Sequence, residues 1–186
     1  MHHETITIGI AGGSASGKST ISEILSKRLQ DVSVKLIHMD KYFKKVRPMI
    51  VAPYTGKTYE DHNHPDVIDF DTLIKDYQAS HGKYDVIIIE GLFTLHHDEI
   101  RSFLDLKIFI DCQADERIIR RIKRNLAWGL SFDEITDVYL DAVRHRHQTY
   151  VEPSRWHADM VLNGSTPSDV GYEIITNWIQ ANRGDK

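Results

Sequence analysis

A short stretch near the start of the chain, residues 6–20 (ITIGIAGGSASGKST), constrains the fold more than any other part of the sequence. Residues 6–11 are predominantly apolar, as in a parallel strand buried on both faces. Residues 12–19 match G-x-x-x-x-G-K-[ST] at every fixed position, and residues 21–29 carry apolar side chains at helical spacing. A glycine- and serine-rich turn could match by chance, but the flanking strand and helix are the context that a phosphate-binding loop requires.

Each residue type in this loop has a physical role. Gly12 and Gly17 allow backbone conformations closed to residues with a Cβ, so successive N–H groups can face phosphate oxygens. The following helix adds the positive end of its dipole. We expect Lys18 to reach the β- and γ-phosphates and the Ser19 hydroxyl to bind Mg²⁺. The predicted nucleotide-binding residues are Gly12, Gly13, Ser14, Ala15, Ser16, Gly17, Lys18, Ser19 and Thr20.

Composition limits the class of protein. The 186 residues, 41% hydrophobic and 27% charged, fit one globular domain over residues 1–186 with an adequate core. The net charge of −4 gives no general basic surface for nucleic acid. A single cysteine, Cys112, rules out an internal disulfide framework, and no apolar run approaches the length of a membrane span. We therefore expect a cytoplasmic protein that binds neither nucleic acid nor membrane.

Apolar runs and helical periodicities alternate along the chain. This alternation predicts an α/β fold of three layers, in which helices cover both faces of a mostly parallel five-stranded sheet. The predicted strands are 6–11, 32–39, 84–91, 106–111 and 158–164, and the predicted helices are 21–29, 69–80, 97–103, 114–126, 131–150 and 167–181.

Residues 41–66 interrupt this pattern. They contain three prolines and show no sustained period. So long an irregular segment in a compact domain is usually functional or disordered. Aromatic and charged side chains alternate within it, among them Tyr42 and Phe43, which favours an ordered loop facing a substrate over a flexible surface loop.

Acidic residues end two of the predicted strands. Asp40 follows strand 32–39, at the sheet edge where open α/β proteins bind ligands. It is a candidate general base for an attacking hydroxyl, or alternatively a cap of the next helix. Glu90 ends strand 84–91 in the manner of a Walker B strand, whose terminal carboxylate faces Mg²⁺. Alternatively, Glu90 caps a helix or is an ordinary surface charge.

Four arginines, Arg117, Arg120, Arg121 and Arg124, lie at positions i, i+3, i+4 and i+7 and so share one face of helix 114–126. A charged helix face is ordinarily just solvated. Guanidinium groups, however, pair bidentately with phosphoryl oxygens. We predict that at least one of Arg121 and Arg124 stabilises charge during phosphoryl transfer.

Six segments in order resemble the uridine kinase and phosphoribulokinase family of P-loop kinases: GGSASGKST, HMDKYFK, NHPDVIDFDTL, IIIEGLFTL, ADERIIRRIKR and YVEPSRWHADMVLNG. The resemblance spans nearly the whole chain. It implies transfer of the γ-phosphoryl group of ATP, with Mg²⁺, to a hydroxyl of a small molecule such as a nucleoside. It also implies that Asp40 is the general base, that Glu90 assists Mg²⁺, and that Arg121 and Arg124 belong to a small mobile helical lid around 117–131. Residues 41–66 would be the substrate loop.

Three departures from the family concern the acceptor and the lid. Asn63 stands where uridine kinases usually carry the aspartate that contacts the ribose hydroxyls. The segment that recognises the pyrimidine is absent, and Trp128-Gly129-Leu130 replaces the usual R-G-R of the lid. In lacking that segment the chain looks more like nicotinamide riboside kinase, where an aspartate near this loop holds the ribose. In this chain Asp66 would fill that role. The predicted acceptor contacts are Asp40, Tyr42, Phe43, Asn63, Asp66 and Glu90.

Other functions stay open at this point. The acceptor could be nicotinamide riboside, pantothenate or a sugar, and the chain could bind a nucleotide without kinase activity. Asn63 and the altered lid favour a non-catalytic protein, whereas Asp40 and Lys18 argue against it. A regulatory GTPase should carry N-K-x-D, which does not occur. The sequence leaves open whether the donor is ATP or GTP and whether the protein is a monomer or a homo-oligomer.

Overall fold

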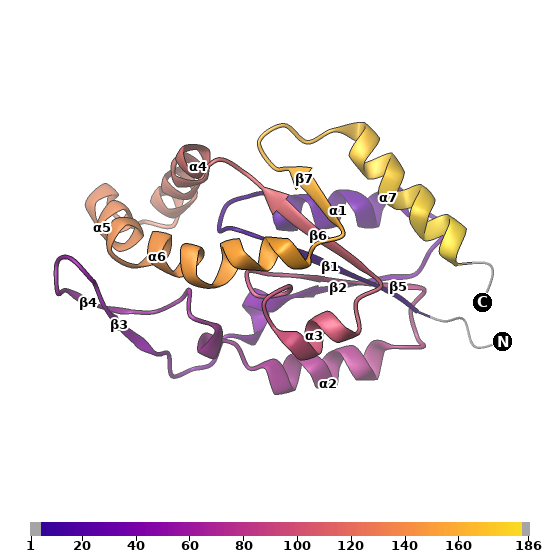
Figure 1. Cartoon of the computed structure of the whole chain (residues 1–186), viewed down its shortest axis with the longest axis horizontal. Coiled ribbons are helices and arrows are strands. Elements are labelled where there is room, and N and C mark those ends of the chain that lie inside the picture. Colours follow the sequence, from indigo (N-terminus) through magenta and orange to yellow (C-terminus); the bar gives the residue numbers. More distant parts are fainter. Residues whose placement is uncertain (1–4, 184–186) are drawn as a thin grey trace.

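The computed structural model describes residues 5–183, and its centre is a sheet of five parallel strands in the order β2-β5-β1-β6-β7 (Figure 1). β1 lies in the middle, so the loop that follows it leaves from the centre of the carboxyl edge of the sheet. The predicted α/β fold with a parallel five-stranded sheet is confirmed. The strands are β1 (Ile6–Gly12), β2 (Val34–His38), β5 (Val86–Glu90), β6 (Leu106–Asp111) and β7 (Met160–Asn163).

Helices cover both faces of the sheet, which explains why every residue of β1 and β5 is buried (Figure 1). α1 (Lys18–Arg28) and α7 (Asp169–Asn182) pack on one face through residues such as Leu25 and Ile175. α2 (Phe70–Ser80) and α3 (Asp98–Ser102) pack on the other through residues such as Leu73 and Ile100. No helix within residues 5–183 is long and apolar enough to cross a membrane.

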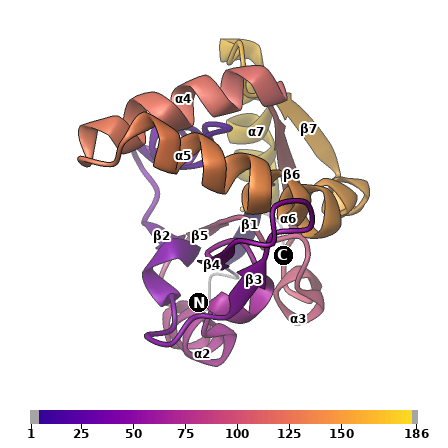
Figure 2. The same cartoon turned by 90° about the vertical axis from the view of Figure 1, so that its left-hand side faces the viewer.

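A helical arm lies over the carboxyl edge of the sheet (Figure 2). It begins with α4 (Ala114–Ala127) and turns back in α5 (Phe132–Val138), where Ser131 and Glu134 form a capping box. The helix then continues beyond residue 150, its predicted end. Its remaining parts are a π-helical turn at Tyr139–Val143, α6 (Arg144–Arg146), a second π-helical turn at His147–Val151 and a 3₁₀ segment at Glu152–His157.

The prediction that residues 41–66 contain no regular structure was wrong. They include an antiparallel hairpin of β3 (Met49–Val51) and β4 (Thr58–Glu60), which lies beside the helical arm (Figure 2). Short 3₁₀ turns precede and follow the hairpin at Met39–Tyr42 and Pro65–Val67. Each hairpin strand has three residues, and Ile50 is the buried one among the six. Such short strands give too little alternation for a sequence pattern to indicate.

Candidate active site

The phosphate-binding loop joins β1 to α1 and has the backbone that its glycines permit. Gly17 precedes α1 with φ of 102°, and Ala15 also has a positive φ, of 64°. At Gly13 a Cβ would lie 2.4 Å from Arg117 Nη1, so a larger residue there would force the Arg117 side chain to move. Arg117 is itself buried and donates from Nε to the Cys112 carbonyl over 3.0 Å. The loop is therefore supported from below by an arginine of α4.

Lys18 lies buried at the start of α1. Its Nζ donates to the Gly13 carbonyl over 2.9 Å, so the ammonium group folds back over the loop. Burial lowers the pKa of Lys18, while the nearby carboxylates of Glu90 and Asp40 oppose that shift. This places a cation with acidic neighbours at the position where the phosphates are expected.

Two strand ends meet beside the loop. The parallel register of β2 and β5 pairs His38 with Glu90, whose side chain is only 6% exposed. Glu90 Oε1 accepts a hydrogen bond from Ser19 Oγ over 3.0 Å and lies 2.8 Å from His38 Nδ1. His38 was not among the predicted site residues, although the pairing of residues at the ends of adjacent parallel strands could have indicated it.

Asp40 follows the same strand end, as the second residue of the turn Met39–Tyr42, whose N-cap is His38. It is thus not the cap of this turn. Asp40 is solvent-exposed and lines the cavity described below. Desolvation by the protein around this carboxyl raises the pKa of Asp40, with Lys18 opposing the shift and Glu90 adding to it. A carboxylate with a raised pKa beside a phosphate-binding loop is suited to accept a proton.

A cavity of about 1330 Å³ runs from the loop to the hairpin and the helical arm. Pockets for small ligands ordinarily measure roughly 300–1,000 Å³, so this one has room for two substrates. The predicted residues that line it are Ser14, Ala15, Gly17, Lys18, Ser19, Thr20, Asp40, Phe43, Asn63, Glu90, Arg121 and Arg124.

The remaining predicted residues do not line the cavity. Gly12, Gly13 and Ser16 belong to the loop but lie beneath its surface, and Ser16 is fully buried. Tyr42 packs against the core and donates from its hydroxyl to Asp76 of α2. The Asp66 side chain is 78% exposed and lies 3.5 Å from His64 Nδ1.

The four arginines of α4 have different partners. Arg121 Nη1 and Arg124 Nη2 both approach Ser14 Oγ, at 3.2 and 3.5 Å, and the Arg124 guanidinium lies 5.0 Å from the ring centre of Trp128. Burial lowers the pKa of both Arg121 and Arg124. These two side chains therefore converge over the loop, in agreement with the face predicted for them.

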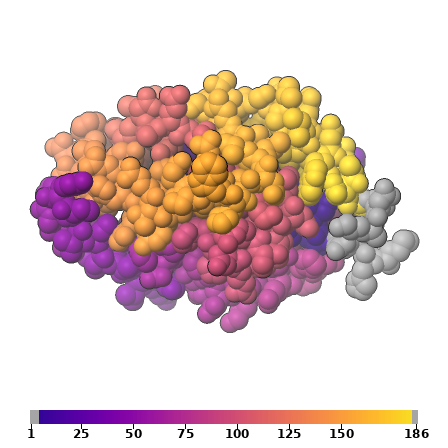
Figure 3. All heavy atoms as spheres, viewed as in Figure 1, coloured from indigo at the N-terminus to yellow at the C-terminus, as the bar shows by residue number. Residues whose placement is uncertain are grey.

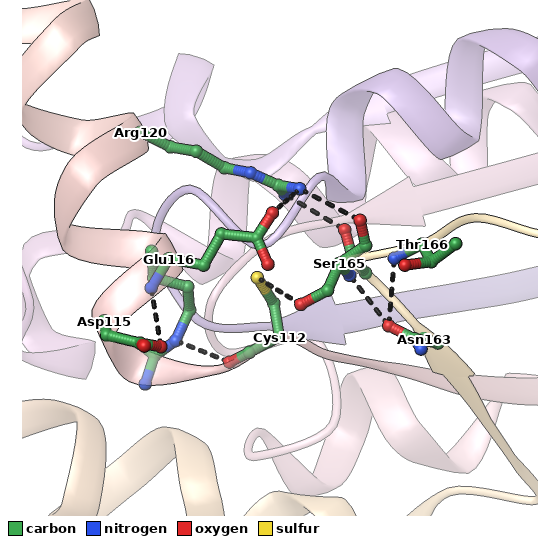
Figure 4. A network of polar contacts seen from close by, with 9 residues as sticks. Cys112, Asp115, Glu116, Arg120, Asn163, Ser165 and Thr166 are labelled. Carbon is green, nitrogen blue, oxygen red and sulfur yellow. Dashed lines mark hydrogen bonds and ion pairs between the residues drawn. The ribbon is translucent and has the colours of Figure 1, made fainter.

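Arg120 points to the other side, toward the loop between β7 and α7 (Figure 4). It donates from Nη1 to the Gly164 carbonyl over 3.0 Å and forms an ion pair with Glu116. It also lines the cavity. Arg120 was predicted on the shared face without a role of its own. Its partner Gly164 lies 44 residues away in the sequence, so no local pattern indicated the contact.

Few side chains are available to bind a metal ion. Among residues 5–183 there is no group of three or more His, Cys, Asp or Glu side chains that could hold one. Mg²⁺ in phosphoryl-transfer sites, however, is bound by substrate phosphates and water together with one or two oxygen ligands from the protein. The hydroxyl of Ser19 and the carboxylate of Glu90, 3.0 Å apart, fit that requirement.

The fold and the site together define a P-loop nucleotide-binding protein of the α/β class. Comparison with known proteins narrows this class. The sequence profile of the phosphoribulokinase/uridine kinase family matches residues 7–82 and 75–170. Uridine kinases from the Staphylococcus aureus strains JH9 and Newman are 33% identical over 202 aligned positions, covering 95% of this chain and 96% of each relative. The chain therefore belongs to the phosphoribulokinase/uridine kinase family.

A solved structure supports the fold alone. The protein TT1252 from Thermus thermophilus superposes with a TM-score of 0.59 over 98% of this chain and 100% of its own, at 19% identity.

Proposed function

We propose that the protein transfers the γ-phosphoryl group of ATP to a hydroxyl of a small molecule, with a nucleoside of the uridine type as the acceptor. One observation carries the proposal: Asp40, Lys18 and Glu90 all line the cavity that the phosphate-binding loop opens into, and the Lys18 ammonium group folds back over that loop. A base, a phosphate-binding cation and an acid suited to Mg²⁺ are the parts that this reaction needs.

Each residue then has a distinct task. Asp40 takes the proton of the acceptor hydroxyl. As it does so, the acceptor oxygen bonds to the γ-phosphorus, and the bond between that phosphorus and the leaving oxygen of ADP breaks. Lys18 balances negative charge on the phosphate oxygens. Ser19 and Glu90 would hold Mg²⁺, which supplies further charge neutralisation when bound. The raised pKa of Asp40 strengthens it as a base.

We also propose that residues 117–131 act as a lid over the loop, with Arg121 and Arg124 stabilising the transferring phosphoryl group. The support is that both guanidinium groups reach the same Ser14 hydroxyl from a helix that lies across the mouth of the loop. Closure of such a lid would exclude water, which would otherwise hydrolyse ATP without an acceptor.

The choice of a nucleoside rests on the relatives and on the cavity wall. The alignment with the Staphylococcus uridine kinases is longer than this chain, so those relatives carry residues that it lacks. Phe43 and Asn63 still line the cavity together with Asp40 and offer an aromatic ring and an amide to the acceptor. The same groups suit nicotinamide riboside, pantothenate or a sugar.

The test is ADP release with Mg·ATP against a panel of acceptors, with the products identified by mass spectrometry. The panel holds uridine, cytidine, nicotinamide riboside, pantothenate, ribulose 5-phosphate and several sugars. Phosphorylated uridine or cytidine would support the proposal in full. Another phosphorylated product would support kinase activity but show that the acceptor is not a uridine-type nucleoside. ATP binding with no phosphorylated product on any member would favour a nucleotide-binding protein without kinase activity.

A further inference from the structure

The helical arm holds the hairpin region in place through side chains of its two π-helical turns and of α6 between them. Asp141 lies in the turn at Tyr139–Val143, Arg146 in α6 and Tyr150 in the turn at His147–Val151. All three side chains contact the hairpin region. Figure 3 shows the purple atoms of the hairpin region lying directly against the orange atoms of the arm.

Besides the exposed ion pair between Lys57 and Asp137 of α5, three residues of the arm contact the hairpin region in order along the chain. Asp141 Oδ2 accepts hydrogen bonds from the hydroxyls of Thr55 and Tyr59, over 2.7 and 2.8 Å. Arg146 Nε donates to Asp61 Oδ2 over 2.6 Å. The Tyr150 hydroxyl lies 2.8 Å from His64 Nε2. Residues 55–64 are therefore fixed at three points along one side of the arm.

The middle contact involves the most buried of these carboxylates. The Asp61 side chain is fully buried and that of Arg146 is 23% exposed. Asp61 uses its second oxygen, Oδ1, to accept a hydrogen bond from the Asn63 backbone N–H over 3.0 Å. Its own backbone N–H donates to the Pro48 carbonyl over 2.8 Å, which ties it to the start of the hairpin. Removing one partner of such a pair leaves the other charge buried without compensation.

This ion pair lies just outside the cavity. Neither Asp61 nor Arg146 lines it, whereas the next two residues, His62 and Asn63, both do. Asp61 thus connects an arginine of the arm to the backbone of a residue that faces the acceptor. A displacement of about 1 Å at such a residue is enough to lower turnover by roughly 10²-fold.

We propose that Asp61 and Arg146 are positioning residues for the acceptor and that they act through Asn63. This inference rests on the proposed kinase function. The pair sets where the Asn63 amide lies relative to Asp40, and so it controls the binding of the acceptor without contacting ATP.

The experiment compares the full-length wild type with Asp61→Asn, Arg146→Gln and the double variant, using uridine or, where uridine is inert, the panel member with the highest kcat/KM. We expect each single variant to raise the KM for the acceptor by about 10- to 100-fold, with the KM for Mg·ATP unchanged. The double variant should be no worse than the poorer single variant, because the two residues act as one unit.

A matched control separates positioning from general stability. Asp105 accepts a hydrogen bond from the Thr7 backbone N–H over 2.7 Å, near the start of β1 and away from the cavity. Asp105→Asn should lower Tm and leave both KM values unchanged. If Asp61→Asn lowers Tm in the same way and leaves the KM for the acceptor unchanged, the positioning role is wrong while the kinase function stands. If the wild type phosphorylates no panel member, the proposed function fails, and the role inferred from it fails as well.

Discussion

The two ends of the cavity are built in different ways. The donor end is one continuous stretch, residues 12–20, whose backbone is shaped by Gly17 and whose cation, Lys18, bonds within the same loop. The acceptor end is assembled from residues 40–64 and the helical arm, which contact each other across up to 86 positions of sequence. The backbone conformation of the donor loop is therefore specified locally, although Arg117, Arg121 and Arg124 contact the loop from α4. The acceptor end has no contiguous motif of its own and depends on contacts between distant segments.

This difference suggests how the two ends respond to change. A locally specified loop tolerates substitutions elsewhere, because its conformation comes from its own glycines and from the helix that it begins. The acceptor end, which is assembled from distant segments, changes its shape when any of its side-chain contacts is lost. Members of one family can then share a donor site and differ in their acceptors, and substitutions at the two ends should alter different kinetic constants.

The largest effect is expected at Asp40, where the two ends meet. Asp40→Asn keeps the shape of the side chain and removes its ability to take a proton, so kcat should fall by about 10²–10⁴-fold. Binding of Mg·ATP, measured by calorimetry, should be largely retained, because the loop is untouched. Near-full turnover by this variant would show that Asp40 is not the base.

A smaller effect is expected over the donor loop. Arg121→Ala removes one of the two guanidinium groups at Ser14, and loss of one such charge-stabilising donor lowers kcat by roughly 10²-fold. Lys123→Ala is the matched control, since Lys123 lies on the same helix, is exposed and does not line the cavity. Steady-state assays with saturating substrates should leave the control within about twofold of the wild type. Equal losses of kcat in both variants would show that the substitutions damage α4, and would argue against a role of Arg121 in charge stabilisation.

The acceptor wall should respond through KM. Asn63→Ala removes an amide that lines the cavity, and we expect the KM for the acceptor to rise by about 10-fold with the KM for ATP unchanged. Asp66→Ala tests the other candidate for the same role. Because the Asp66 side chain is 78% exposed and outside the cavity lining, its effect should be smaller. A larger effect at Asp66 than at Asn63 would mean that the wall rearranges when the acceptor binds.

The smallest effect concerns stability. The pKa of Asp40 is raised in the folded protein above its ordinary value of 3.8, so the folded state holds a proton more tightly than the unfolded chain does. Stability then falls as pH rises through the window between these two pKa values. Asp40→Asn cannot ionise and should raise Tm slightly at about pH 7.5, with a smaller gain at about pH 4.5. A loss of Tm at the higher pH, seen by calorimetric scanning, would contradict this account.

The parts of the fold and site that could be predicted from sequence are those with local signals. The strands and helices of the sheet follow hydrophobic periodicity, and the phosphate-binding loop is a contiguous motif. The positions of Asp40 and Glu90 at the cavity could be predicted because a parallel sheet brings its strand ends to one edge, while their roles stay predictions.

The parts that were missed depend on long-range contacts. The hairpin strands Met49–Val51 and Thr58–Glu60 are too short to show a period. The pairing of Asp61 with Arg146 joins positions 85 residues apart, and no local pattern indicates it. Helical spacing correctly placed Arg117 and Arg121 on one face of α4, but it could not show that one lies beneath the loop and the other above it.

The measurement that tests the central claim most directly is a single turnover of Mg·ATP by the wild type with uridine and without it, following ADP and phosphorylated uridine together. The account predicts that the two products form at the same rate and in equal amounts, and that ADP formation slows sharply when uridine is left out. ADP and inorganic phosphate appearing at the same rate with and without uridine would contradict it. That result would indicate a nucleotide hydrolase in place of a kinase that acts on a nucleoside.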